Sequence, residues 1–441
     1  MVTFGVSLAG WKAVNGYHFL NMMGRMPTLI LVVFSFCATL LLTRAINNFG
    51  LSTWRRSRAK HWTLRARLLY PIRITAGLSM LILPADIYLL ASSLLPSVPA
   101  WAPAGSSLLA ALLGTYWPSR EIFPETTFRE WLTSRLMILL GRVIPFALFL
   151  WATVTMPENF GAETWMIAGL LFLLLATLRL GGTIRFFSLL GLLKPADKRL
   201  AGIAADVARR MNVQPRRIWM VPGAFANAYA LPLNRELFFS EGLLRHLSDA
   251  QIAAVTGHEL AHLTEPRRVL FLRLMQPVIL FPLVLIRPLI ATGGNGLMWA
   301  GGLLAVTLIV RTRFRRLGRH MEVRADAIAS VNEGEEAAYA QALQRLYEVN
   351  QMPAVMSGRR RIHPNLYDRL AAAGITPDFP KPDPPQRYTL MSILLCLSPF
   401  AISFALAVRT NNSPHTKVHA GAGGDVTFPA PRLGAGGVQD K

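Results

Sequence analysis

Two histidines and a glutamate stand at a spacing that suits metal-dependent hydrolysis. They form the motif His258-Glu259-Leu-Ala-His262. Residues four positions apart share one face of a helix, so both imidazoles can reach a single zinc ion. Glu259 lies about 100° further round the helix, where its carboxylate can take a proton from a zinc-activated water. The alternative is a solvated helix on which these three side chains have no joint role.

A catalytic zinc ion needs a third protein ligand, and a second pair of residues could supply it. Glu322 and Asp326 are again four positions apart, in Met-Glu322-Val-Arg-Ala-Asp326. One carboxylate, for which Glu322 is the candidate, can bind the metal. The other can hydrogen-bond a ligand imidazole and fix its tautomer. On spacing alone, an ordinary charged surface with local ion pairs explains this segment equally well.

Local signals predict the elements that must position these residues. Ser248, with Gln251 three residues later, is typical of a capping box at the start of a helix. That helix is predicted to run through 251–263 and therefore to carry both histidines. Apolar spacing and turn residues predict a helix over 196–211 and short strands at 218–221 and 237–239.

The composition indicates a membrane protein. Hydrophobic residues make up 52% of the 441 residues and charged residues 16%, and the mean hydropathy is +0.37. Soluble proteins are typically about 25% charged, so the composition excludes an ordinary soluble globule and a disordered chain. Cys37 and Cys396 lie in apolar segments without a CxxC spacing, which excludes a zinc ribbon and a disulfide framework.

Apolar segments predict about eight membrane spans. The pair at 269–290 and 297–310 could form a hairpin across the membrane or lie partly in it. Asp86, inside a predicted span, is either a functional acid or a residue at the membrane edge. The predicted spans are 26–43, 75–95, 105–117, 136–156, 164–180, 269–290, 297–310 and 390–408.

The charge of the chain predicts its topology. Lys and Arg number 46 against 24 Asp and Glu, a net charge of +22. The basic residues flank the apolar segments, as the positive-inside rule requires, and no interleaving with aromatic residues suggests nucleic-acid binding. Segments 51–73, 179–217 and 311–319 are therefore predicted to face the cytoplasm. This places the N-terminus outside and the His258 and Glu322 segments inside.

Four motifs together resemble the HtpX and type-1 CAAX prenyl protease family, which are integral-membrane zinc endopeptidases of the gluzincin type. As an ordered set over about 196–370, they are far more specific than any one motif. They are Asn227-Ala-Tyr-Ala230 followed by Glu236-Leu-Phe-Phe-Ser240, then His258-Glu259-Leu-Ala-His262, then Glu322-x-x-x-Asp326, and finally His363-Pro364 followed by Arg369-Leu370.

The resemblance implies a zinc site with one ion per chain. His258, His262 and Glu322 would be its ligands, and Asp326 would support a ligand from behind. Glu259 would act as the general base and then donate a proton to the leaving amine.

The resemblance also implies contacts with substrate. His363 would contact the metal or stabilise the oxyanion. The strand at Asn227 would pair with an extended substrate backbone. The implied function is hydrolysis of membrane or misfolded proteins at the cytoplasmic face of a bacterial inner membrane. Its partners would be protein or peptide substrates and the lipid bilayer, without nucleic acid.

Other functions fit parts of the sequence. A membrane sensor or transducer could use a zinc-protease-like domain on one partner, and the additional N-terminal spans and the tail would suit it. A zinc site inside a span is disfavoured because Asp249, Glu265 and Arg267 flank the histidine helix. A transporter would be the interpretation if the zinc residues were accidental.

We therefore predict a mainly α-helical polytopic membrane protein with an α+β zincin-like protease domain. The predicted parts are an N-terminal membrane region with about five spans (1–194), a soluble part with the two histidines (195–268), two membrane segments (269–310), a soluble helical part with the third ligand (311–387), a last span (388–409) and a disordered tail (410–441).

Overall fold

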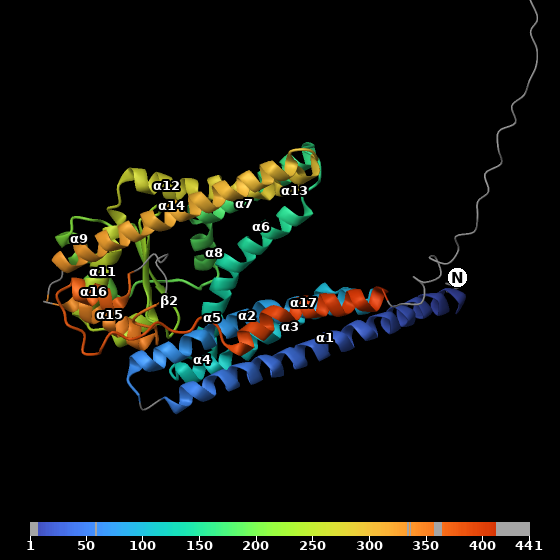
Figure 1. Cartoon of the computed structure of the whole chain (residues 1–441), viewed down its shortest axis with the longest axis horizontal. Coiled ribbons are helices and arrows are strands. Elements are labelled where there is room, and N and C mark those ends of the chain that lie inside the picture. The colour runs from blue at the N-terminus through green and yellow to red at the C-terminus, as the bar shows by residue number, and fades with distance from the viewer. Residues whose placement is uncertain (1–7, 58–59, 333–334, 336, 357–363, 412–441) are drawn as a thin grey trace, which may run out of the picture. The chain divides into compact units, whose positions relative to one another are not determined.

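The computed structural model describes residues 8–57, 60–332, 335, 337–356 and 364–411 (Figure 1). It is largely helical with one small sheet, which confirms the predicted fold class. The tail after residue 411 and His363 lie outside the described residues. The chain forms two compact units. The first comprises 1–39, 78–111 and 393–441, and the second comprises 40–77 and 112–392.

The elements before the sheet are helical. In chain order they are α1 (Leu8–Arg56), α2 (Trp62–Leu94), α3 (Trp101–Gly114), α4 (Tyr116–Ile122), α5 (Phe128–Ile138), the π-helical turn η1 (Leu139–Val143), α6 (Ile144–Thr155), α7 (Ala162–Thr177), the π-helical turn η2 (Leu178–Gly182) and α8 (Thr183–Leu189).

The sheet and the histidine helix follow. These elements are β1 (Lys194–Pro195), α9 (Lys198–Arg210), β2 (Arg217–Val221), β3 (Ala228–Leu231), β4 (Glu236–Ser240), α10 (Glu241–His246) and α11 (Asp249–Leu263).

The remaining elements are again helical. They are α12 (Arg267–Leu280), the 3₁₀ turn η3 (Phe281–Leu285), α13 (Ile286–Ala291), α14 (Gly296–Val331), α15 (Ala338–Val349), α16 (Leu366–Ala372) and α17 (Leu390–Asn411).

Seven helical segments of the described residues are long and apolar enough to cross a membrane. The predicted segment at 105–117 is not among them, because α3 has 14 residues and spans about 21 Å, short of the roughly 30 Å hydrocarbon core. Three such segments, an odd number, then separate the basic regions 51–73 and 179–217, so the two regions cannot both face the cytoplasm as the sequence predicts. The seven are Pro27–Arg56, Trp62–Leu94, Phe128–Thr155, Ala162–Leu189, Arg267–Ala291, Gly296–Val331 and Leu390–Val408.

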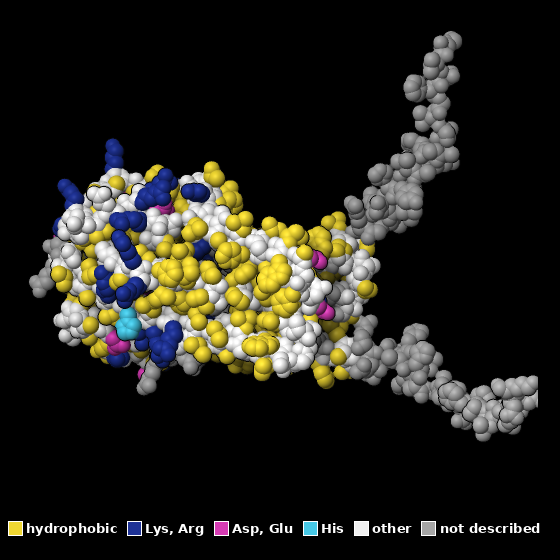
Figure 2. Space-filling view, turned by 90° about the horizontal axis from the view of Figure 1, so that it is seen from above, with side chains coloured by type: hydrophobic (Ala, Val, Ile, Leu, Met, Phe, Trp, Pro, Cys, Tyr) yellow, Lys and Arg dark blue, Asp and Glu magenta, His cyan; other side chains and the backbone are white. Residues whose placement is uncertain are grey.

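These helices expose apolar side chains, as lipid-facing segments would. Leu297, Trp299 and Leu308 of α14 are each more than half exposed. On the face drawn in Figure 2, hydrophobic side chains cover a broad area, and Lys and Arg side chains gather towards one end. This distribution agrees with apolar spans that carry basic flanks.

The first unit contains parts of α1, α2, α3 and α17. Its helices exchange hydroxyl contacts, such as Thr39 Oγ1 to Ser107 Oγ at 2.8 Å. Asp86 is 7% exposed and accepts a hydrogen bond from Ser398 Oγ at 2.6 Å. Asp86, the acid inside a predicted span, is therefore buried between α2 and α17.

The second unit contains a four-stranded sheet in the order β1-β2-β4-β3. β2 and β4 are parallel, with Trp219 opposite Phe238. β3 is antiparallel to β4 and lies at the sheet edge. Every residue of β4 is buried, because its Glu-Leu-Phe-Phe-Ser sequence is covered on both faces. The strands predicted at 218–221 and 237–239 are confirmed as β2 and β4.

The core of this unit forms where α9 and α11 pack against the sheet. Leu200 and Val207 of α9 meet Leu237 and Phe239 of β4 and Ile252 of α11. α11 also packs extensively against α14, α15 and β3. The histidine helix is therefore enclosed by elements from three distant parts of the chain, which fixes its rotation and position.

Candidate metal centre

α11 carries both histidines of the motif and begins as the sequence predicts. Ser248 caps its first turn, and Gln251 completes a capping box with the Ser248 backbone. At the other end, the Arg324 guanidinium of α14 donates to the carbonyl oxygens of Ala261 and Thr264, both at 3.2 Å. Both helix ends are therefore satisfied, and the helix is pinned to α14 next to the candidate third ligand.

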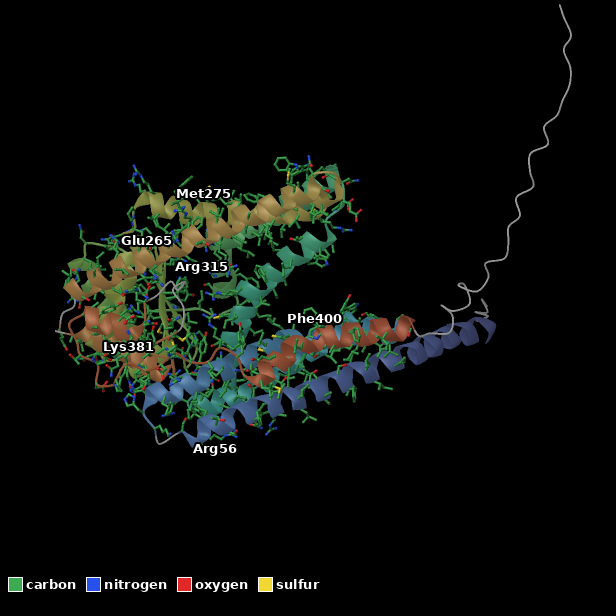
Figure 3. All side chains as sticks on the ribbon, in the orientation of Figure 1. Arg56, Glu265, Met275, Arg315, Lys381 and Phe400 are labelled. Atoms are coloured by element: carbon green, nitrogen blue, oxygen red, sulfur yellow. The ribbon has the colours of Figure 1, made fainter. Side chains whose placement is uncertain are left out.

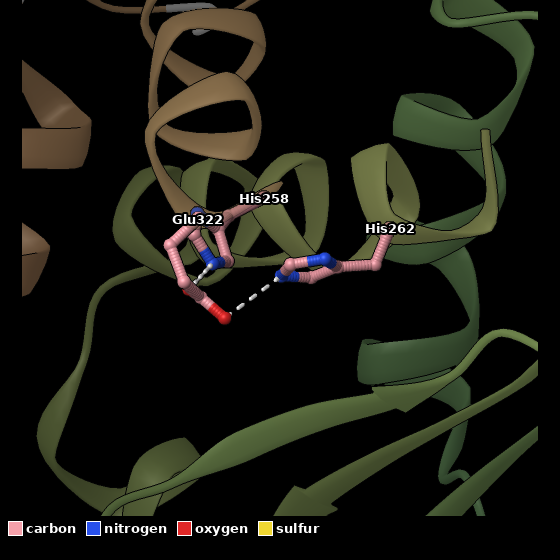
Figure 4. A group of neighbouring side chains, drawn as sticks. All are labelled: His258, His262 and Glu322. Atoms are coloured by element: carbon pink, nitrogen blue, oxygen red, sulfur yellow. Dashed lines mark ion pairs between the residues drawn. The ribbon is translucent and has the colours of Figure 1, made fainter. Parts of the chain in front are cut away.

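His258, His262 and Glu322 converge on one point (Figure 4). His258 Nε2 lies 3.5 Å from Glu322 Oε2, and His262 Nε2 lies 3.8 Å from Glu322 Oε1. One ligand atom from each residue lies within 4.8 Å of the others, and all three side chains belong to a buried cluster. The pairing of the two sequence motifs, which spacing alone left open, is thus present in the fold.

His258 is supported from behind by a network of three side chains. Its Nδ1 lies 3.1 Å from Asp326 Oδ1 and 2.7 Å from the Tyr339 hydroxyl. Tyr339 donates to Asp326 Oδ1 at 2.6 Å. Arg369 donates to both Asp326 oxygens, at 2.9 and 2.6 Å. This network fixes the ring so that Nε2 faces Glu322.

The electrostatic field around His258 favours a cation. Burial alone would lower the pKa of its imidazolium, but hydrogen bonds from the ring to Asp326 and Glu322 raise that pKa to about 9. The surrounding carboxylates therefore stabilise positive charge at this ring. A divalent metal ion at the Nε2 side would meet the same field.

His262 is supported by a smaller group. Its Nδ1 lies 3.0 Å from Glu265 Oε1, and Arg273 of α12 donates to the same oxygen at 2.6 Å. The Glu265 side chain is 1% exposed. Glu265, which Figure 3 labels, follows the last residue of α11 by two positions. From the sequence, Glu265 is interpreted only as a flanking charge, although an acid three residues after the second histidine is within reach of that ring.

Glu259 lies on the same helix and is 7% exposed. Burial raises the pKa of its carboxyl, while the charges of His258 and His262 act in the opposite direction. The backbone of Ala230 in β3 is hydrogen-bonded to it. Glu259 therefore lies next to both imidazoles and to the edge strand β3. Its buried carboxyl takes up a proton more readily than an exposed one would.

The residues fit a zinc ion. Two imidazoles and one carboxylate form a known ligand set of catalytic zinc, with a further position open to water or substrate. Each ring is oriented by a carboxylate at its other nitrogen, Asp326 for His258 and Glu265 for His262. Such outer partners are typical of metal-binding histidines and set both tautomer and basicity.

The structure places the other predicted site residues less completely. Asn227 directly precedes β3, and its backbone N–H donates to Ser240 Oγ at 2.8 Å. The role of Asn227 toward substrate stays a prediction, as does that of His363, which lies outside the described residues. Tyr339 was not predicted. It reaches Asp326 from α15, and only tertiary packing reveals it.

Comparison with known proteins agrees with this geometry. Residues 195–375 match the model of Peptidase family M48. The chain is similar to a Protease HtpX homolog of Archaeoglobus fulgidus, at 41% identity over 69 residues, which is 15% of this chain and 20% of that protein. It is also similar to a Protease HtpX homolog of Acaryochloris marina, at 36% identity over 67 residues, which is 14% of this chain and 23% of the relative.

The chain thus spans about a fifth of the length of the curated relatives it matches. The resemblance to HtpX and M48 peptidases is confirmed for the segment that contains the candidate metal centre.

Proposed function

We propose that this protein is a membrane-embedded zinc endopeptidase that hydrolyses membrane or misfolded proteins at the cytoplasmic face. The observation that carries the proposal is the buried convergence of His258, His262 and Glu322, with ligand atoms within 4.8 Å of one another. The match of residues 195–375 to a peptidase family supports the same reaction class.

His258, His262 and Glu322 would hold the zinc ion. When bound, zinc supplies a Lewis acid that polarises the scissile carbonyl and makes water easier to deprotonate. Glu259 accepts the proton as the water oxygen bonds to the carbonyl carbon. When the C–N bond breaks, Glu259 returns that proton to the leaving nitrogen. Burial raises the pKa of Glu259, which suits a carboxyl that must hold the proton between these steps.

The edge strand β3 would align the substrate. β3 pairs with β4 on one side and lies at the edge of the sheet, so an extended peptide can add to it by main-chain hydrogen bonds. The hydrogen bond between Glu259 and the Ala230 backbone supports this role, because it brings β3 next to the residue that would act as the base. Asn227, just before β3, would contact the same peptide.

Charge supports the cytoplasmic assignment of the site. The apolar part of α14 ends at Val310, and five arginines follow within the next nine residues of the same helix, at positions 311, 313, 315, 316 and 319. By the positive-inside rule this end of the helix faces the cytoplasm. Glu322 lies three residues further on, so the site would be on that side of the membrane.

Zinc content and casein cleavage by the detergent-purified full chain test the proposal. We expect about one zinc ion per wild-type chain. Glu259→Gln should retain zinc and lose cleavage, because it removes the base and no ligand. Glu322→Ala should lose both. His246→Ala, which removes a histidine outside the cluster, is the matched control and should retain both.

The outcomes separate the two functions considered for this sequence. Zinc binding without cleavage of casein or other unfolded substrates would favour a sensor that acts on one partner. A wild-type chain without zinc, or a Glu259→Gln variant that still cleaves, would overturn the peptidase assignment.

A further inference from the structure

A pocket of about 350 Å³ lies away from the metal centre, between α8 and the sheet. Leu180, Ile184 and Leu189 form its helical wall, and Trp219 and Glu236 belong to the strands β2 and β4 on the other side. The helical wall is the end of the apolar segment Ala162–Leu189, one of the candidate membrane spans. The pocket therefore opens where a span meets the protease-like domain.

Three arginines line this pocket: Arg185 on α8, Arg216 just before β2 and Arg217 at its first position. All three are exposed. Within the described residues, none of them forms an ion pair. The one carboxylate in the wall, Glu236, is 6% exposed and accepts a hydrogen bond from Trp219 Nε1 at 3.1 Å. The pocket lining thus contains three arginines and a single acid, and the Arg217 guanidinium lies over the Trp219 ring, 5.7 Å from its centroid.

A backbone kink builds the pocket. Gly181 has φ +107° in the turn between α7 and α8, a conformation that side-chain-bearing residues rarely adopt. Asn234, in the turn before β4, donates to the Leu180 carbonyl at 3.5 Å. A Cβ at Gly181 would lie 2.8 Å from Asn234 Nδ2. The sheet can therefore approach the end of the span closely enough to place Arg216 and Arg217 opposite Arg185.

The rim of the pocket is strongly apolar. Of its lining leucines, Leu189 is 87% exposed and Leu180 is 62% exposed. A free phosphate ion would satisfy the arginines but leave these leucines uncovered. A ligand with a phosphate head and hydrocarbon chains would satisfy both, because the chains would cover the leucines.

We propose that this arginine pocket binds the phosphate headgroup of an anionic phospholipid, whose acyl chains lie against Leu180 and Leu189. Basic pockets at the cytoplasmic ends of spans favour anionic lipid headgroups for the same electrostatic reason. The bound lipid would join α8 to the start of β2, and so would hold the protease-like domain against the membrane surface.

Lipid retention by the intact protein tests this inference. The full chain is purified in detergent, mixed with phosphatidylglycerol or phosphatidylcholine, and analysed by native mass spectrometry. The test variant is Arg185→Gln/Arg216→Gln/Arg217→Gln. The control is Lys198→Gln/Arg209→Gln/Arg210→Gln, which removes the same charge from the exposed face of α9. Melting temperature and zinc content show that both variants fold.

We expect the wild type and the control to retain one phosphatidylglycerol molecule that survives detergent exchange, in preference to phosphatidylcholine. The test variant should bind it at least about tenfold more weakly, since each arginine near an anionic surface adds to affinity. Equal retention by the test and control variants would overturn the proposal, because it would reduce the binding to a general effect of net charge. Inorganic phosphate at millimolar concentration should not displace the lipid. Displacement by phosphate alone would identify a soluble anion as the ligand and overturn the lipid assignment.

Discussion

The two histidines of the candidate metal centre are held in different ways. Behind His258, the carboxylate of Asp326 is itself fixed by Tyr339 and by two hydrogen bonds from Arg369. These supports come from three helices, α14, α15 and α16. Behind His262, a single carboxylate, that of Glu265, is fixed by Arg273.

Residues behind a ligand histidine can stabilise the fold, orient the ligand, or do both, and the two groups should differ in this respect. The His258 network joins three elements of the fold, so its loss should affect both the stability of the fold and metal binding. The ion pair between Glu265 and Arg273 connects only the end of α11 to the neighbouring helix α12. Glu265 Oε2 has no hydrogen-bond partner among the described residues. Its loss should affect metal binding more than stability.

Asp326→Ala should have the largest effect. It leaves Arg369, whose side chain is 8% exposed, as a buried charge without its carboxylate, at a cost of about 3–5 kcal/mol in unfolding free energy. Zinc content should fall as well, because His258 loses its oriented partner. Thermal unfolding in detergent and metal analysis measure both. The control is Asp368→Ala, which breaks an exposed ion pair with Lys381 and should cost under about 1 kcal/mol. Similar losses of stability and zinc in both variants would show that Asp326 has no special role in supporting His258.

Glu265→Gln should lower zinc affinity by about 10–100-fold, the range usual for partners of ligand histidines. The fall in melting temperature should be smaller than for Asp326→Ala, because Arg273 is 30% exposed on its side chain and can be solvated. Competition with a zinc chelator measures the affinity. Glu241→Gln, which removes the partner of Lys194, serves as the control. An unchanged zinc affinity would show that Glu265 has no positioning role.

Tyr339→Phe should have a smaller effect. It removes one hydroxyl, worth about 1 kcal/mol in stability, while Asp326 Oδ1 still lies 3.1 Å from His258 Nδ1. Zinc affinity should fall only several-fold by the same chelator titration. Tyr367→Phe, at a partly exposed ring of α16, is the control. A loss as great as that of Asp326→Ala would mean that the hydroxyl, and not the carboxylate, orients the ring.

Ser248→Ala should have the smallest effect on the centre. It removes the N-cap of α11 and lowers stability by about 1 kcal/mol, but it lies ten residues before His258 and touches neither support. Zinc stoichiometry should stay at the wild-type value in metal analysis. A selective loss of zinc would mean that the helix start, and not the outer carboxylates, positions the ligands.

Local patterns made part of this site predictable. The capping box fixed the start of α11, and helical spacing placed both histidines on one face, because these features depend on neighbours within one or two turns. The Glu322–Asp326 pair follows from the same periodicity. The approach of Glu322 to the two histidines depends on packing between α11 and α14, which local patterns do not encode. Before the structure, only the family resemblance indicated that these three residues meet.

The outer residues were less accessible to sequence reasoning. Tyr339 and Arg369 lie 13 and 43 residues beyond Asp326, on separate helices whose mutual packing no local signal encodes. The resemblance implied only that Arg369 lies near the site. The prediction of a membrane span at 105–117 was wrong because apolar composition does not set the length of a helix. α3 ends at Gly114, too short to cross a bilayer.

α14 joins the candidate metal centre directly to a candidate membrane span. This helix runs unbroken from Gly296 to Val331, and Glu322 lies 12 residues beyond the end of its apolar part at Val310. At 1.5 Å per residue that is a lever of roughly 18 Å. A tilt of about 5° about its apolar end would move Glu322 by roughly 1.5 Å, far beyond the ~0.2 Å tolerance of a metal–ligand bond. A change of helix tilt, such as hydrophobic mismatch produces, would therefore act on the geometry of the candidate metal centre.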